Sequence, residues 1–386
     1  MRKTALSLAI AIGFLLMTTS AAWAAATEQV LYSFTDGSDG GYPLAGLVFD
    51  DAGNLYGTTS SGGVYDQGTV FEVSQSNGTW SETVLYSFTG GADGQYPASG
   101  LLIDKAGNLY GTTQRGGVYG LGTVFELRRS ATEWREIVIS TFSNGGSEPS
   151  GLVRDQAGNA FGTTQAGGAY GRGTVFGMQR TQTGWQQLAL YSFGANGTDG
   201  ITPESGVVLG SGERLYGTTP NGGYGRGTVF ELTYSPSGWT EKIIYYFQGG
   251  YDGSTPYAGL VIDRAGNLYG TTSSGGEYND GTVFELTKSA QGWSKAIIYN
   301  FNGVNPSTSA LTFDQSGNLY GETYDAIFEL SPSNGEWTET SFFDFDGTDG
   351  FYPNGGLIFD QAGNMYGTTD SGGGVFGAGE VFEITP

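Results

Sequence analysis

The sequence contains no histidine and no cysteine. Without histidine, the chain cannot form a Ser-His-Asp triad, a histidine metal site or a histidine pH switch. Without cysteine, it has neither disulfides nor thiol chemistry. These two absences exclude the usual nucleophilic triads and zinc centres as the basis of any activity.

Positive charge is also scarce. The chain has 16 Lys and Arg against 38 Asp and Glu, which gives a net charge of −22. A field of that sign repels nucleic acid and anionic lipid and attracts cations. We therefore expect no nucleic-acid partner.

The first 26 residues have the pattern of a secretory leader. Arg2 and Lys3 precede an apolar run, residues 5–17, and the small residues that follow include the cleavage pattern Ala22-x-Ala24. The run is too short for a membrane span. We predict a signal peptide at 1–24, a single mature domain at 25–386, a secreted or periplasmic location, and no membrane insertion after cleavage. Because no disulfide is available, the core or the topology must hold the fold closed.

Glycine is abundant, with 69 residues, but it recurs at a fixed period. The phrase Gly-Asn-Leu-Tyr-Gly-Thr-Thr, or a close variant, occurs seven times, at intervals of about 46 to 55 residues. The copies are residues 53–59, 107–113, 158–164, 213–219, 266–272, 317–323 and 363–369. Such periods, with several short strands in each unit, are typical of β-propellers.

One unit can be divided into four strands, a to d. Residues 100–104 form strand a, 108–113 strand b, 123–127 strand c and 134–142 strand d, with turn residues between them. The repeat therefore predicts an all-β, seven-bladed β-propeller with four antiparallel strands in each blade.

The two ends of the chain predict how the ring closes. The mature chain begins on a d strand, residues 30–34, and ends after a c strand, residues 380–384. An open array would leave an unpaired edge at each end. We expect these two strands to pair and close a monomeric ring.

The repeat also resembles a known family. The stretch Gly-Asn-Leu-Tyr-Gly-Thr-Thr-x-x-Gly-Gly-x-Tyr-x-x-Gly-Thr-Val-Phe-Glu, at 53–72 and 107–126, is similar to the GloVer tandem repeat of the "choice-of-anchor" bacterial extracellular proteins. The resemblance implies a secreted repeat protein and supplies no catalytic residues. Members typically carry a C-terminal anchor, whereas this chain stops at Pro386, directly after a strand, so we expect no tether.

Candidate site residues lie in the d-to-a and b-to-c loops, which a propeller places on one face. Recurrent aspartates occupy the d-to-a loops, followed by Gly and then Pro. They fit turn chemistry, or alternatively a calcium or hydroxyl-binding ring. A weak calcium pattern, Asp344, Asp346 and Asp349, lacks EF-hand spacing, so calcium is the one cofactor left open. The loop aspartates are Asp39, Asp93, Asp199, Asp252 and Asp349.

The b-to-c loops repeat an aromatic residue and, in three successive units, an arginine. Recurrence in nearly every unit favours packing between blades for the tyrosines, with stacking on sugars or peptides as the alternative. The arginines could form an anion-binding sector, or reflect neutral drift. The residues are Tyr65, Tyr119, Tyr170, Tyr224, Tyr278, Arg115, Arg172 and Arg226. Six tryptophans that open the d strands are interpreted as packing.

Breaks in the repeat are stronger functional candidates than the repeat itself. The third unit carries Arg154 before its turn and Gly177 where others have Glu, and the sixth has Glu322 in place of Thr. Taken together, the sequence favours a secreted, non-enzymatic binding or scaffold propeller for an extracellular glycan, peptide or protein. The alternative is a carboxylate-based polysaccharide hydrolase or lyase.

Overall fold

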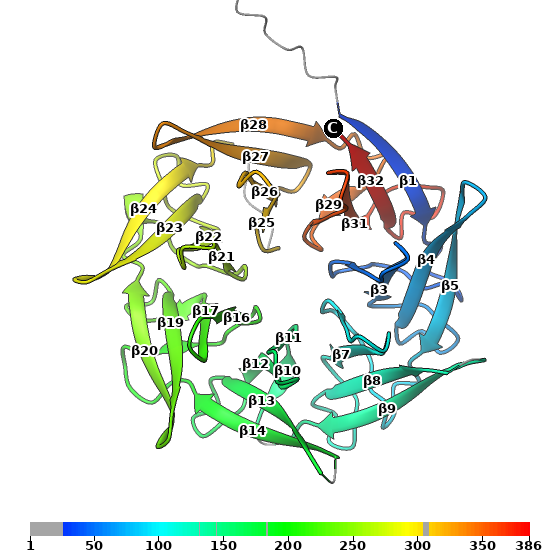
Figure 1. Ribbon diagram of the computed structural model, residues 1–386, viewed down its shortest axis with the longest axis horizontal. Coiled ribbons are helices and arrows are strands. Elements are labelled where there is room, and N and C mark those ends of the chain that lie inside the picture. The colour runs from blue at the N-terminus through cyan, green and yellow to red at the C-terminus, as the bar shows by residue number, and fades with distance from the viewer. Residues whose placement is uncertain (1–25, 131, 144, 183, 304–308) are drawn as a thin grey trace, which may run out of the picture.

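The chain forms a ring of seven β-sheet blades around a central axis (Figure 1). This computed structural model describes residues 26–386 except 131, 144, 183 and 304–308, so the predicted signal peptide lies outside the described residues. The predicted seven-bladed, all-β propeller with four antiparallel strands per blade is confirmed. Within the described ranges no helix is long and apolar enough to cross a membrane.

The blades follow the order of the sequence. Blade 1 contains β2 (Val48–Phe49), β3 (Leu55–Thr59), β4 (Thr69–Ser76) and β5 (Thr79–Ser87). Blade 2 contains β6 (Leu102–Ile103), β7 (Leu109–Thr113), β8 (Thr123–Arg129) and β9 (Trp134–Thr141). Blade 3 contains β10 (Ser147–Pro149), β11 (Val153–Arg154), β12 (Ala160–Ala166), β13 (Thr174–Thr181) and β14 (Gly184–Ser192). Blade 4 contains β16 (Val208–Gly210), β17 (Arg214–Thr219), β19 (Thr228–Ser235) and β20 (Gly238–Tyr246), beside the small pair β15 (Gly200–Ile201) and β18 (Asn221–Gly222).

The remaining blades complete the circle. A short 3-10 turn, η1 (Gly250–Asp252), precedes blade 5, which contains β21 (Val261–Ile262), β22 (Leu268–Thr272), β23 (Thr282–Ser289) and β24 (Gly292–Asn300). Blade 6 contains β25 (Thr312–Phe313), β26 (Leu319–Glu322), β27 (Ala326–Ser333) and β28 (Glu336–Asp344). Blade 7 contains β29 (Phe351–Pro353), β30 (Ile358–Phe359), β31 (Met365–Ser371) and β32 (Glu380–Thr385), and its outer strand is β1 (Thr27–Ser33).

Strand b is the most deeply buried element of each blade. All five residues of β7 are buried, because the strand has paired neighbours on both sides and a blade against each face. Its Gly111 is required by close approach, since a Cβ there would lie 2.6 Å from the ring of Phe125 on strand c. The repeated glycine of the phrase thus makes room for a repeated phenylalanine, which is why the two recur together.

The hydrophobic core is divided among the seven junctions between blades. The junction of blades 1 and 2, for example, packs Tyr56, Val70 and Phe88 against Leu109 and Phe125. The other six junctions contain equivalent clusters. No blade has a core of its own, so each is stable only with its neighbours in place.

Threonines also connect the blades. Thr112 in strand b donates its hydroxyl to the backbone carbonyl of Ser150 in the next blade at 3.1 Å. In blade 6 this position is Glu322, whose Oε2 instead accepts the N–H of Gly356 at 3.1 Å. The polarity of the contact is reversed there, but the link between the blades remains.

The ring closes through the two ends of the chain, as the sequence predicts. β1 pairs antiparallel with β32 from Thr27 opposite Thr385 to Ser33 opposite Glu380, with one irregularity near Val30. Figure 1 shows β1, the first strand in the chain, at the outer edge of the last blade. The pairing covers the edge that β32 would otherwise expose.

Removal of β1 should open this ring. A chain that begins at Thr35 loses the buried Leu31 and the whole β32 pairing. We expect aggregation and a melting temperature lower by roughly 10 °C or more, given about 2–3 kcal/mol for one buried side chain and additional lost hydrogen bonds. Size-exclusion chromatography and thermal melting measure both effects. A chain that begins at Thr27 is the control, and a monomeric truncation with unchanged melting would contradict closure by this strand.

Candidate functional site

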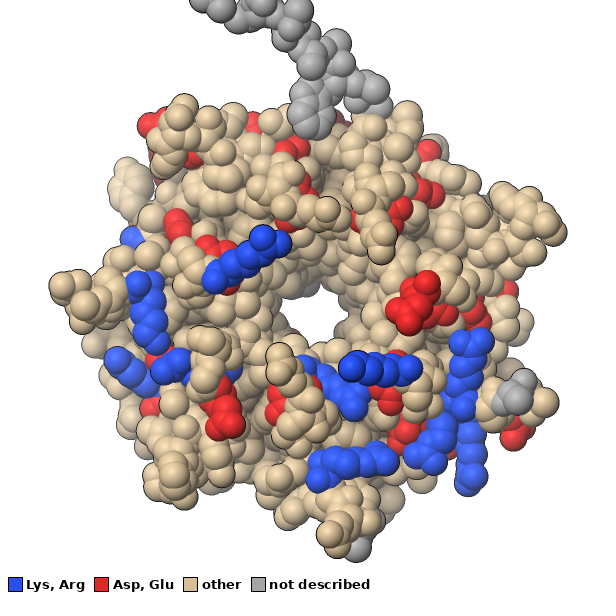
Figure 2. Space-filling model, viewed as in Figure 1, with Lys and Arg blue, Asp and Glu red and all other residues tan. Residues whose placement is uncertain are grey.

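The two predicted loop sets do lie on one face of the ring. Backbone bridges join d-to-a loops to the b-to-c loops that follow them, as at Gln95 with Arg115 and at Ser254 with Ser274. The a-to-b turns and the c-to-d hairpins lie on the opposite face. We call these the loop face and the turn face; Figures 1 and 2 look onto the turn face.

The loop aspartates organise their own loops. Asp93 accepts hydrogen bonds from the hydroxyl of Tyr86 at 2.9 Å and from the backbone N–H and hydroxyl of Thr89 at 2.8 and 2.6 Å. Its counterparts accept similar bonds from the preceding d strand or the loop backbone. These are Asp39, Asp199, Asp252 and Asp349. The contacts match the turn interpretation of the aspartates.

The calcium pattern of blade 7 is not assembled as a metal group. The carboxylate of Asp344 accepts the hydroxyl of Ser341, and that of Asp346 accepts the N–H and hydroxyl of Thr348. Among the described residues no set of three or more acidic side chains is arranged to hold a metal ion. The carboxylate of Asp349 accepts the N–H groups of Asp346 and Gly347, so all three aspartates accept hydrogen bonds from their own segment, and calcium binding there stays a prediction.

The loop tyrosines are at the surface, and their interpretation as packing between blades is wrong. The exposed fractions of Tyr65, Tyr119, Tyr170, Tyr224 and Tyr278 lie between 49% and 67%. The b-to-c loops contain Gly residues with positive φ, and the ring of Tyr224 contacts Tyr246 of its own blade at 5.5 Å rather than a neighbouring blade. The Gly-Gly-x-Tyr phrase gives no signal of this, because buried and exposed tyrosines fit it equally well.

The three loop arginines occupy successive blades on the loop face, as predicted. Arg115 lies over the ring of Tyr96 at 5.5 Å. The side chain of Arg172 lies beside Gly194 and that of Arg226 beside Gly249. Arg172 and Arg226 therefore cover the d-to-a loop that follows their own blade, whereas Arg115 covers the one that precedes its blade.

Packing between blades is carried out by the tryptophans of the d strands. Trp134 packs edge-on against Tyr56, Trp185 against Tyr110, and equivalent pairs recur around the ring, with centroid distances of 5.7 to 6.2 Å. The packing interpretation of the tryptophans agrees with these contacts.

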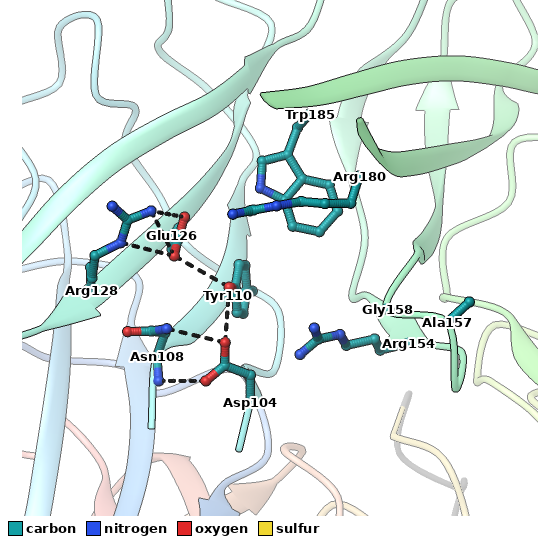
Figure 3. A pocket seen from close by; sticks show the side chains of 10 residues that line it. All are labelled: Asp104, Asn108, Tyr110, Glu126, Arg128, Arg154, Ala157, Gly158, Arg180 and Trp185. Carbon is teal, nitrogen blue, oxygen red and sulfur yellow. Dashed lines mark hydrogen bonds and ion pairs between the residues drawn. The ribbon is translucent and has the colours of Figure 1, made fainter. Parts of the chain in front are cut away.

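A pocket of about 420 Å³ opens on the turn face, between blades 2 and 3. Figure 3 shows Arg154 and Arg180 extending into it from blade 3, opposite Tyr110 and Glu126 of blade 2. Ten residues line it: Asp104, Asn108, Tyr110, Glu126, Arg128, Arg154, Ala157, Gly158, Arg180 and Trp185.

The blade 2 wall is held by a repeated polar network. Asp104 accepts bonds from the backbone N–H and side chain of Asn108 and from the Tyr110 hydroxyl at 3.1 Å. The hydroxyl of Tyr110 also lies 3.3 Å from Glu126, which pairs with Arg128 at 3.1 Å. This network fixes the acceptor oxygens of the wall.

Departures of blade 3 from the repeat create the other wall. Other blades place an apolar residue of strand a on the neighbouring tyrosine, as Phe49 does on Tyr366 at 5.1 Å. Blade 3 has Arg154 there, 5.6 Å from the centre of the Tyr110 ring. Arg180 lies 5.0 Å over Trp185. Sequence reasoning identified Arg154 as a break but missed Arg128, Arg180 and Trp185, because their juxtaposition joins residues about 50 positions apart.

Basic side chains are concentrated around this pocket. Every Lys and Arg after residue 3 lies between Lys105 and Lys295, within blades 2 to 5. Figure 2 shows those of the turn face as an arc, with none on that face over blades 6, 7 and 1. We call the following set the basic arc: Lys105, Arg128, Arg129, Arg154, Arg180, Arg214, Arg264 and Lys288.

The pKa values of two carboxylates shift in opposite directions, that of Asp104 in the pocket downward and that of Glu322 at the junction of blades 6 and 7 upward. Burial acts to raise the pKa of Asp104, but hydrogen bonds from Asn108, Ala106 and Tyr110 outweigh it and lower the pKa. Burial raises the pKa of Glu322 to about 7, but that side chain is only 2% exposed and no second carboxylate contributes to its shift. Neither arrangement is the accessible acid–base pair that glycoside hydrolysis requires.

Comparison with protein families matches the Gloeobacter/Verrucomicrobia repeat at residues 17–224, 135–326 and 214–386, which together span the ring. The chain belongs to the Gloeobacter/Verrucomicrobia repeat family. This confirms the resemblance found in the repeated phrase. A comparison with curated proteins finds no match.

Solved structures similar to this repeat protein share its fold at low sequence identity. The extracellular domains of the B. thetaiotaomicron two-component systems BT4673 and BT3049 have TM-scores of 0.59 and 0.58 at 12% and 14% identity. The chain is covered to 92% and 94% but spans only 39% and 41% of those chains. An ulvan lyase of family PL25, bound to -[GlcA(1-4)Rha3S]-, has a TM-score of 0.53 at 9% identity, with 90% of this chain and 94% of that chain covered.

Carboxylates of the repeat protein also meet at several junctions between blades, beneath the loop face. Burial and the nearby Asp93 raise the pKa of Glu136 to about 7. Burial raises the pKa of Glu82 and of Glu241 to about 7 in the same way, with Asp39 and Asp199 as the respective neighbours. Burial, with Asp349, Glu380 and Asp346, raises the pKa of Glu28 to about 8.

These pKa values predict how the stability of the protein depends on pH. A glutamate with a folded pKa near 7 and an ordinary value of 4.5 stabilises the fold fully below about pH 4.5, and that stabilisation is lost as pH rises through 7. When unfolding by denaturant is measured in buffer that contains a chelator, the free energy of unfolding should fall as the pH is raised from 5 to 8.5. Glu136→Gln should reduce the slope, whereas Gln at the exposed Glu133 should leave it unchanged. Rising stability over this range would contradict the assignment.

Proposed function

We propose that this protein is an extracellular binding propeller, and that its ligand is an acidic saccharide held in the pocket between blades 2 and 3. The predicted leader, the repeat family and the fold support a role outside the cytoplasm. The proposal moves the binding site from the loop face, which the sequence favours, to the turn face.

Two unpaired guanidinium groups are the observation that carries the proposal. Arg154 and Arg180 form no ion pair with any residue that the structure describes, although acidic residues outnumber basic ones more than twofold. Both lie instead over aromatic rings, which orient the planar groups and leave their N–H donors available. Such a pair suits a carboxylate or sulfate, which guanidinium binds in a bidentate manner.

The opposite wall supplies what a saccharide needs besides its charge. Asp104, Glu126 and Asn108 place acceptor and donor groups within the same pocket, held by the Tyr110 network. Hydroxyl groups donate to such carboxylates, while the ligand's own negative charge is drawn to the two arginines. A simple anion would meet repulsion from Asp104 without the compensating hydroxyl bonds.

The basic arc extends this site toward a polymer. It continues on both sides of the pocket over blades 2 to 5, and Arg129 and Arg264 in it also form no ion pair with a described residue. A charged chain lying along the arc would be attracted over several units. The acidic blades 6, 7 and 1 would repel it, which orients the chain on the ring.

Binding fits the pocket better than catalysis does. The lowered pKa of Asp104 keeps it ionised, so it is a poor general acid. The similar ulvan lyase supports only the statement that this fold accommodates an acidic glycan in another protein. A hydrolase or lyase activity remains the alternative function, and the assay of product release from the bound polymer tests it.

Substitution of the two arginines tests the site. Arg154→Ala and Arg180→Ala should each weaken binding of polygalacturonate about tenfold, because a hydrogen bond to a charged group contributes about 1.5–3 kcal/mol. Affinity for wild type should fall as salt is raised, since exposed charges are screened. Calorimetry with polygalacturonate, dextran sulfate and neutral dextran separates carboxylate, sulfate and uncharged ligands.

The loop face provides the matched control. Tyr119→Ala combined with Arg172→Ala removes an exposed ring and a cation from that face without touching the pocket. This double variant should bind as wild type does. A defect in the loop variant with normal binding by the pocket variants would place the site on the loop face instead.

A further inference from the structure

At one equivalent position of the d strands, the charge of the side chain differs from one junction between blades to another. This position lies two residues after the tryptophan that opens the strand and faces the d-to-a loop of the preceding blade. Its occupants are Glu28 in β1, which has no tryptophan, and then Glu82, Glu136, Gln187, Glu241, Lys295 and Glu339 around the ring.

At the junction of blades 4 and 5 the occupant is a cation. The ammonium group of Lys295 contacts the backbone carbonyl of Asp252 and lies 3.0 Å from its carboxylate. Its side chain is only 4% exposed, and it lies 5.3 Å from the Phe247 ring. The junction therefore places one buried positive charge against the loop aspartate.

At the junction of blades 3 and 4 the same place holds two carboxylates. Asp199 is 4% exposed, and its Oδ2 accepts bonds from the Tyr191 hydroxyl and from the N–H groups of Gly194 and Ala195. Its Oδ1, and Oε1 of Glu241, are buried and accept no hydrogen bond from any residue the structure describes. Two negative oxygens are thus left uncompensated where the next junction has an ammonium group.

The junction of blades 2 and 3 shows that these charges change together. Its loop has no equivalent aspartate, and Ser140 and Gln187 replace the tyrosine and glutamate. The Ser140 hydroxyl donates to Gln187 Oε1 at 2.5 Å. One junction is therefore neutral and another is an ion pair, whereas the junctions with two carboxylates lack a positive partner among the described residues.

We infer that Asp199 and Glu241 bind a calcium ion at the junction of blades 3 and 4. The inference is independent of saccharide binding. Two carboxylates balance a divalent charge, and calcium accepts carboxylate and carbonyl oxygens in flexible arrangements. The contacts of Lys295 indicate the donor set: Oδ1 and the carbonyl of the loop aspartate, with Glu241 Oε1 added.

Calcium titration of the chelator-stripped protein tests this inference. Calorimetry at pH 7.5 with calcium chloride should show saturable binding, and the melting temperature should rise with calcium but not with sodium at equal ionic strength. Glu241→Lys should bind one equivalent fewer, yet in chelator it should melt at or above the wild-type temperature, because its ammonium takes the place of the ion. Lys295→Glu should bind one equivalent more.

Two comparisons keep the test decisive. Glu133→Lys makes the same charge change at an exposed position and should keep the full stoichiometry. Glu241→Gln should lose one equivalent while retaining the fold by circular dichroism. Absence of calcium binding by wild type, or unchanged stoichiometry in Glu241→Lys, would overturn the inference and indicate that a shared proton compensates the pair.

Discussion

Pairing of β1 with β32 is the interaction on which the rest of the structure depends. Each blade buries its two faces only against its neighbours, so an open array would expose one apolar face at each end and an unpaired edge. Closure removes both at once, without a disulfide. It also holds each blade against two neighbours, so a pocket formed between two blades is lined by residues of two packed sheets.

The closed repeat explains why most of its residues carry no functional information. Seven junctions present nearly the same packing requirement, and the same Gly, Phe, Thr and Trp residues satisfy it at most of them. The glycine at the position of Gly111 is present in every copy of the phrase because the phenylalanine at the position of Phe125 needs the space. The tryptophan at the position of Trp185 recurs because it packs against the aromatic ring at the position of Tyr110. Function in such a ring is more readily found where one junction departs from the others, as Arg154 does.

The sequence was sufficient for the fold because the fold is periodic. Strand order, blade number and closure all follow from spacing and from the identity of the first and last strands. The candidate site was harder to predict from the sequence, for two physical reasons. The pocket depends on Arg154 and Arg180 meeting Tyr110 and Glu126 across a junction, and no local pattern records this contact. The exposure of Tyr119 depends on the path of a glycine-rich loop, which the one-letter pattern leaves open.

Charge is distributed in this ring according to two different constraints. On the turn face, basic residues gather in four consecutive blades, and two arginines in the pocket form no ion pair with an acidic residue in the described part of the chain. Beneath the loop face, buried carboxylates must be compensated where they stand, because desolvation of an unpaired charge is costly. Lys295 does this with an ammonium group and Gln187 by removing the charge. The pair of Asp199 and Glu241 has neither among the described residues, and on our proposal a calcium ion supplies the missing charge, so that the stability of a ring without disulfides would depend on the calcium concentration of the medium.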